Sequence, residues 1–192
     1  MSIQLTVGIL ADEAQDDDHT FRAWITAQFT AVNKLLAAHQ QPPHQEPSIN
    51  ISPFDLTLTS EMFPLHDLAE QIQNTSLLRF PHLLEQSGNA GFYLPRPLPT
   101  PLPIAAASDI MGTVIGSAVA LQAECRLLAM VCNMYTEIEA RPDLTPPTVA
   151  NWADLVAQFD TNGRWTPAVS GCQKLYTAAQ HALRTGCAIV IY

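Results

Sequence analysis

The stretch YLPRPLPTPLPI, residues 93–104, constrains the fold more than any other, because every second position from 95 to 103 is proline. Each proline lacks a backbone N–H and also forces the preceding residue into extended geometry. The spacing does not match the PxxP ligands of SH3 domains, whose prolines lie three apart. The segment is therefore predicted to be an extended strap within one globular domain that spans residues 1–192.

Two roles remain open for this strap. It is a scaffold if its leucines pack on the core, and a binding edge or lid if its side chains face a partner, as long loops often do. The binding interpretation makes Arg96, Leu98 and Leu102 candidate binding residues.

Hydrophobic periodicity predicts three strands. Alternating apolar residues indicate strands at 2–10 and 48–59, and Pro53 makes the second an edge strand or a bent one. The run CAIVIY, residues 187–192, has no polar face and is expected in the middle of the sheet, beside the first strand.

Helical spacing predicts about six helices, the clearest over residues 18–39. A stretch that is apolar nearly all round predicts a long central helix near 110–140. The expected fold class is therefore α/β or α+β, a small mixed sheet of about three strands covered by about six helices.

The charge balance restricts the partners. Nine basic residues face eighteen acidic ones, a net charge of −9, and the arginines are scattered along the sequence. Such a chain repels phosphate backbones, so no nucleic acid is expected as a partner. No segment has the length and polarity of a signal peptide or a membrane span, so we expect a cytoplasmic protein with reduced thiols and no membrane partner.

Three groups of residues are candidates for chemistry. Cys172 lies in the first turns of a predicted helix, where the helix dipole lowers a thiol pKa, but it also lies on that helix's apolar stripe. His82 and Glu85, three residues apart on a helix, could meet as an acid–base pair. Five carboxylates within residues 12–18, among them Asp16 and Asp17, offer oxygen ligands or cap a helix. No metal or cofactor is expected, because no ligand spacing is recognisable.

Two functions follow from these features. The first is an acidic binding protein without enzymatic activity, an inhibitor or immunity-type partner of a basic protein, with Asp16 and Asp17 among its binding residues. The alternative is a small hydrolase or transferase that uses Cys172 or a metal at the acidic cluster. The lack of an assembled catalytic set favours the first, and the low charge content is compatible with a homodimer.

Overall fold

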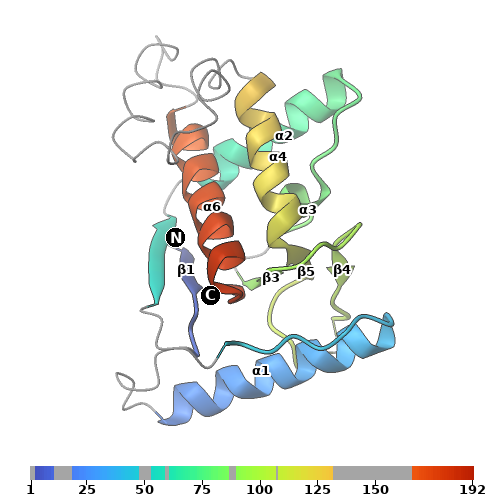
Figure 1. Cartoon of the computed structure of the whole chain (residues 1–192). Coiled ribbons are helices and arrows are strands. Elements are labelled where there is room, and N and C mark those ends of the chain that lie inside the picture. Colours follow the sequence, from blue (N-terminus) through green and yellow to red (C-terminus); the bar gives the residue numbers. More distant parts are fainter. Residues whose placement is uncertain are drawn as a thin grey trace.

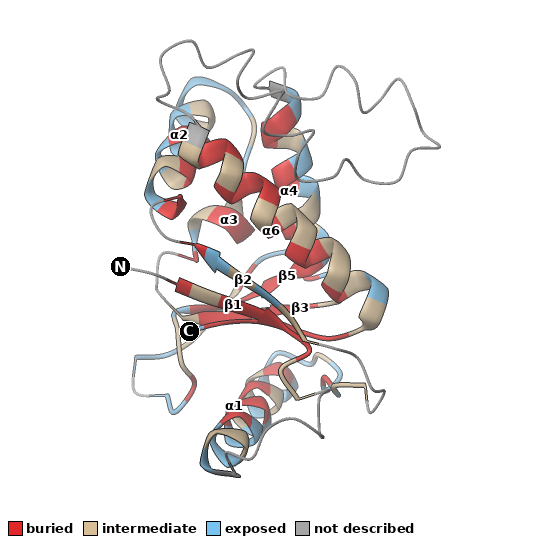
Figure 2. Ribbon diagram, turned by 90° about the vertical axis from the view of Figure 1, so that its left-hand side faces the viewer, coloured by how far each residue is buried: buried red, intermediate tan, exposed pale blue. Residues whose placement is uncertain are grey.

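The computed structural model describes residues 3–10, 19–47, 53–58, 61–86, 90–106, 108–131 and 166–192. These residues form one six-stranded mixed sheet with helices on both faces (Figures 1 and 2). The strands are β1 (Ile3–Val7), β2 (Phe54–Leu58), β3 (Gly91–Leu94), β4 (Leu102–Pro103), β5 (Val114–Ser117) and β6 (Ile189–Ile191). The helices are α1 (His19–Ala38), α2 (Met62–Thr75), α3 (Pro81–Leu84), α4 (Ala118–Val131) and α6 (Thr166–Thr185).

The sheet order is β2-β1-β6-β3-β5-β4, and every neighbouring pair is antiparallel except β3 and β5, which are parallel. The C-terminal strand β6 lies between β1 and β3, so its prediction as a central strand beside the first is confirmed. Ile189 and Ile191 pack in one apolar cluster and Val190 packs in the other. This two-sided burial explains why the strand lacks polar alternation.

Strand β2 lies at one edge of the sheet, as Pro53 predicted, and pairs with β1 from Ile3 opposite Leu58 to Val7 opposite Phe54. Its residues alternate between exposed and more buried positions along the strand. This alternation is the pattern of a strand with one solvated face.

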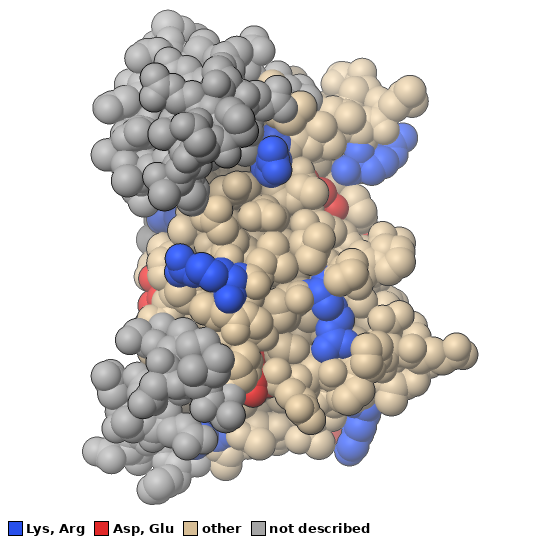
Figure 3. All heavy atoms as spheres, in the orientation of Figure 1, with Lys and Arg blue, Asp and Glu red and all other residues tan. Residues whose placement is uncertain are grey.

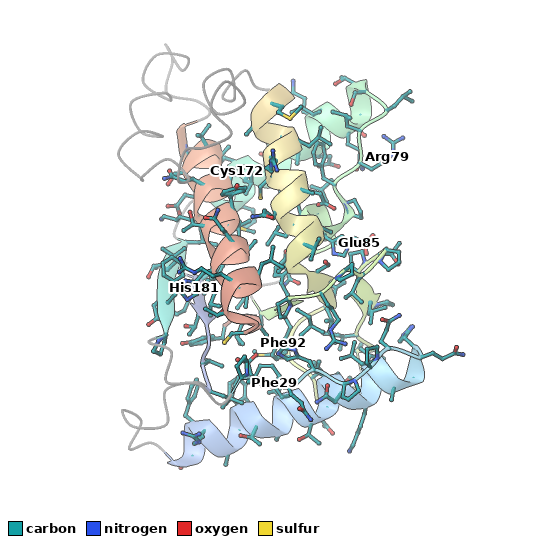
Figure 4. The ribbon with its side chains drawn as sticks, in the orientation of Figure 1. Phe29, Arg79, Glu85, Phe92, Cys172 and His181 are labelled. Carbon is teal, nitrogen blue, oxygen red and sulfur yellow. The ribbon has the colours of Figure 1, made fainter. Side chains whose placement is uncertain are left out.

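The two helical layers are unequal. Helix α1 alone covers one face of the sheet, whereas α2, α3, α4 and α6 cover the other (Figure 2). Beneath α1 the core includes an edge-to-face contact between Phe29 and Phe92, with ring centroids 5.6 Å apart (Figure 4). The larger cluster on the other face joins the four helices to β1, β3 and β6.

The prediction of three strands and a helix starting near 110 is wrong in detail. Residues 114–117 form β5, and α4 begins only at Ala118, where the Ser117 hydroxyl accepts a hydrogen bond from the Ala120 N–H at 3.1 Å. A short, fully buried strand has the same apolar composition as a buried helix, so periodicity alone does not separate them. The predicted part of this helix beyond residue 131 lies outside the described residues.

The ends of the proline strap also belong to the sheet. Tyr93 and Leu94 end β3, and Leu102 and Pro103 form β4 at the edge opposite β2. An edge is where proline is tolerated, because its missing N–H removes no ladder bond on the outer side. The Tyr93 ring lies over Gly116 of β5, where a Cβ would come within 2.4 Å of the ring. Gly116 therefore lets the aromatic ring cross the neighbouring strand.

Candidate protein interface

His82 and Glu85 do not form the predicted pair through their side chains. The His82 ring is buried; its Nδ1 accepts the Ser117 N–H at 3.0 Å, and its Nε2 donates to the Leu98 carbonyl at 3.1 Å. Burial lowers the pKa of His82, which favours this neutral ring. Glu85, by contrast, is exposed (Figure 4). His82 thus holds backbone segments together and has no ring nitrogen left for a substrate.

The carboxylate that contacts the backbone at His82 belongs to Glu124 of α4, a residue that the sequence analysis missed. Its Oε1 accepts the His82 N–H at 3.1 Å and its Oε2 accepts the Leu83 N–H at 2.8 Å, so it caps the start of α3. Burial raises the pKa of Glu124 to about 7, although the two N–H groups oppose the shift. The sequence signal that could have identified Glu124 is an acidic residue, next to Cys125, within an otherwise apolar stretch of a predicted helix.

Two further side chains complete this network. The Tyr93 hydroxyl donates to the His82 carbonyl at 2.8 Å, and burial raises the Tyr93 pKa well above its ordinary value. The Ser117 hydroxyl donates to the Arg96 carbonyl at 2.6 Å. We call His82, Tyr93, Ser117 and Glu124 the α3 network. Its bonds run to backbone groups of α3, the strap and the start of α4, which is what a structural network does.

Cys172 lies in the core between α6 and α4 (Figure 4), where its thiol donates to the Cys125 carbonyl at 3.4 Å. A thiol nucleophile needs access to substrate and a neighbouring group that favours the thiolate. Burial provides neither. His181 lies nine residues further along α6, where it stacks on Phe54 with ring centroids 4.8 Å apart.

The three strap residues predicted to bind a partner make contacts within the fold. The Arg96 guanidinium donates to the carbonyls of Pro42 and Pro43, the latter at 2.9 Å. Leu98 is buried in the cluster beneath α1, and Leu102 is half-buried in β4. An open pocket of about 430 Å³ lies beside Arg96, between the strap and residues 41–45. These contacts are those of a scaffold; partner binding by the three residues stays a prediction.

Asp16 and Asp17, with the rest of the acidic cluster 12–18, lie outside the described residues. Within the described ranges, no three His, Cys, Asp or Glu side chains come together as a potential metal site. In the same ranges, no helix is both long and apolar enough to cross a bilayer.

On the face shown in Figure 3, the described Lys and Arg side chains lie apart from one another. Two of the basic residues serve local contacts: Lys174 forms an ion pair with Glu61 at 2.5 Å, and Arg79 donates to three carbonyls at the end of α2. The described surface therefore shows no continuous basic patch on this face.

One helix presents acidic and apolar side chains together. Phe63, Asp67, Glu70 and Asn74 are exposed and follow one another at spacings of four, three and four, which places them on one side of α2. Leu77, just beyond the end of the helix, is also exposed. We call these five residues the α2 outer face. The sequence analysis did not single out these five residues.

The buried side of α2 fixes the helix in place. Leu65, Leu68 and Ala69 pack into the large core cluster, and α2 lies against α6 and α3. The approach to α6 is close at Gly171, where a Cβ would lie 3.0 Å from that of Glu61. The α2 outer face is therefore carried on a firmly packed element.

Residues 55–191 match the family model described as "Putative DNA-mimic protein". No curated protein and no solved structure matches.

The match contradicts the expectation of no nucleic acid among the partners, because the matched family is described as one of DNA mimics. The sequence analysis counted the repulsion between an acidic chain and phosphates and inferred a basic protein partner, but it did not connect that partner with DNA. Acidity can also make a protein resemble DNA to the proteins that bind it. The matched region runs from β2 to β6 and covers more than half of the chain. The protein therefore belongs to this DNA-mimic family.

Proposed function

We propose that this protein binds a DNA-binding protein at the surface that otherwise holds DNA, and thereby inhibits it. The match of residues 55–191 to the DNA-mimic family carries this proposal. A protein that binds DNA presents Lys and Arg to phosphates, and an acidic chain with a net charge of −9 is attracted to the same groups.

The distribution of charge along the sequence supports the proposal. Eight acidic and seven basic residues lie in the described part of the chain, whereas residues 11–18 hold five acidic residues and residues 132–165 hold five acidic and two basic ones. The described fold is thus close to neutral, and most of the net negative charge is in those two segments of the sequence. Attraction over a Debye length of about 8 Å at physiological salt depends on such excess charge.

The alternative of a hydrolase or transferase has less support. The Cys172 thiol is buried and bonded to a carbonyl, and both ring nitrogens of His82 are committed to backbone groups. Neither arrangement leaves a group that could attack or deprotonate a substrate.

A displacement experiment tests the proposed function. Lysate proteins of the source organism are bound to immobilised duplex DNA, and the purified protein is added at low salt. We expect a DNA-binding protein to leave the DNA in a stable complex with the added chain, identifiable by mass spectrometry. Mutual exclusion then requires that excess duplex DNA dissociates this complex.

The control is an unrelated acidic protein of equal net charge, added at the same concentration. If both proteins release the same material, the release is a general polyanion effect and the proposal fails. It also fails if saturating amounts of the wild-type chain release nothing.

A further inference from the structure

We propose that the α2 outer face (Phe63, Asp67, Glu70, Asn74 and Leu77) is the surface that contacts the DNA-binding partner, with Phe63 and Leu77 as apolar anchors on either side of the carboxylates. This inference rests on the proposed function. It adds apolar contacts, which duplex phosphates cannot supply. It therefore predicts that the partner's affinity for this chain depends on salt differently from its affinity for DNA.

The first support is the exposure of the two apolar side chains. Phe63 is 76% exposed and Leu77 is 94% exposed, whereas the other exposed large apolar side chains in the described residues reach only 38 to 42%. Of these two, Phe63 lies in the first turn of α2, and Leu77 lies two residues beyond its last residue, Thr75. Single exposed apolar residues are common, but two strongly exposed ones near the two ends of a helix that carries exposed carboxylates are typical of an interaction surface.

The second support is the charge between the anchors. Asp67 and Glu70 are separated by about 4.5 Å along the helix axis, and α2 contains neither Lys nor Arg. The ion pairs found among the described residues, His44 with Glu46 and Lys174 with Glu61, do not involve them. Their negative charge is therefore available to a basic partner.

Arg79 is the basic residue that follows this face in the sequence. Its Nη1 donates to the carbonyls of Gln73, Ser76 and Leu78 at 3.3, 3.2 and 2.7 Å, so it satisfies the C-terminal end of α2. A cation at a helix C-terminus is favourable, and in that place it stabilises the helix that carries the two carboxylates.

The third support is the rigidity of the helix. Leu65, Leu68 and Ala69 are buried, and close contact with Gly171 leaves α2 little freedom against α6. A surface that is ordered before binding loses less conformational entropy on association. The five residues can thus be presented in one fixed arrangement.

These features define the partner surface. From Phe63 to the last residue of α2, Thr75, the helix rises about 18 Å, and Leu77 lies two residues beyond that end. The partner must therefore offer basic side chains between two apolar contact sites, one for each end of α2. Because apolar contacts are not screened by ions, affinity should fall less steeply with salt than the partner's affinity for DNA.

The test uses the DNA-binding protein that the wild-type chain displaces from duplex DNA. The dissociation constant of its complex with this chain is measured over a range of salt concentrations for three forms of the chain. These are wild type, the double variant Phe63→Ala with Leu77→Ala, and the double variant Asp67→Asn with Glu70→Gln. We expect the apolar variant to bind about 30-fold or more weakly at every salt concentration, as loss of interface anchors does. The charge variant should lose about 3- to 10-fold at low salt and show a smaller salt dependence.

Matched controls place the same changes on other elements. Val119→Ala with Met130→Ala removes exposed apolar atoms from α4, and Glu85→Gln with Asp109→Asn removes two exposed carboxylates outside α2. We expect both controls to bind within about 2-fold of wild type. Equal losses in the controls and the α2 variants would overturn the assignment to α2.

The remaining outcomes separate the two proposals. If wild type displaces a partner and the apolar variant displaces it equally well, this inference is wrong and the proposed function stands. If wild type displaces nothing, both fail. If ultracentrifugation shows that wild type is a dimer and that the apolar variant is a monomer, the face is covered by a second copy of the chain and the inference is overturned.

Discussion

Glu124 and Glu70 belong to the same helical layer, yet their carboxylates do opposite things. Glu124 is buried on α4, and its carboxyl oxygens accept two backbone N–H groups of α3, so they serve contacts within the fold. Glu70 is exposed on the outer side of α2, beside Asp67. The first stabilises the fold and the second is available to a partner.

The same contrast separates the α3 network from the α2 outer face as a whole. The network contains histidine, tyrosine, serine and glutamate, the residue types of an active site, and all of their described bonds serve backbone groups. The α2 outer face contains no reactive group and has the two most exposed large apolar side chains of the described residues. Residue type alone therefore suggests an active site at the α3 network, whereas the burial and bonding partners of these residues indicate a structural role.

Truncating the two glutamates should separate these roles most strongly. We expect Glu124→Ala to lower the free energy of unfolding by about 2 to 4 kcal/mol, because two buried N–H groups lose their acceptor. Glu70→Ala should change it by less than about 0.5 kcal/mol. Urea denaturation of both variants checks this, and equal effects would remove the distinction between the two regions.

The pH dependence of stability should sharpen the contrast. Burial raises the pKa of Glu124 to about 7 from an ordinary value of 4.5, so the folded state binds this proton more tightly than the unfolded chain does. The contribution of Glu124 to stability is therefore greatest below pH 4.5 and declines as the pH rises to 7.

Comparison of wild type with Glu124→Gln, which cannot titrate at this position, isolates that contribution. We expect the stability of wild type relative to the variant to fall by about 3 kcal/mol between pH 4.5 and pH 7.5. Stability curves that run parallel over this range would show that Glu124 is not shifted. Asp67→Asn on the α2 outer face provides the reference for an exposed carboxylate.

The smallest expected effect concerns Leu77. Because its side chain is 94% exposed, Leu77→Ser should change the free energy of unfolding by less than about 0.5 kcal/mol. Leu83 of α3, which is fully buried, is the matched comparison, and Leu83→Ala should cost about 2 to 5 kcal/mol. A large loss at Leu77, measured by thermal or urea denaturation, would mean that it packs within the fold and is not an anchor.

Sequence patterns predicted the parts of the fold that depend on one segment alone. The central position of the C-terminal strand followed from its lack of polar residues, and the edge position of β2 followed from Pro53. Strands β3 and β5 were missed because each is four residues long and apolar on both faces. At that length, the period that separates strand from helix cannot be read.

The site was less predictable than the fold because it depends on long-range contacts. Glu124 lies 42 residues from the N–H of His82, and no spacing rule connects them. The exposure of Phe63 and Leu77 depends on which side of α2 packs against α6. Only the tertiary packing decides that side.

The most direct test of DNA mimicry is a competition titration. The affinity of the displaced DNA-binding protein for duplex DNA is measured at increasing concentrations of this chain. We predict that the apparent dissociation constant for DNA rises in proportion to the concentration of the chain while the amount of DNA bound at saturation stays constant. A ternary complex of DNA, partner and chain, with an unchanged dissociation constant for DNA, would contradict the account.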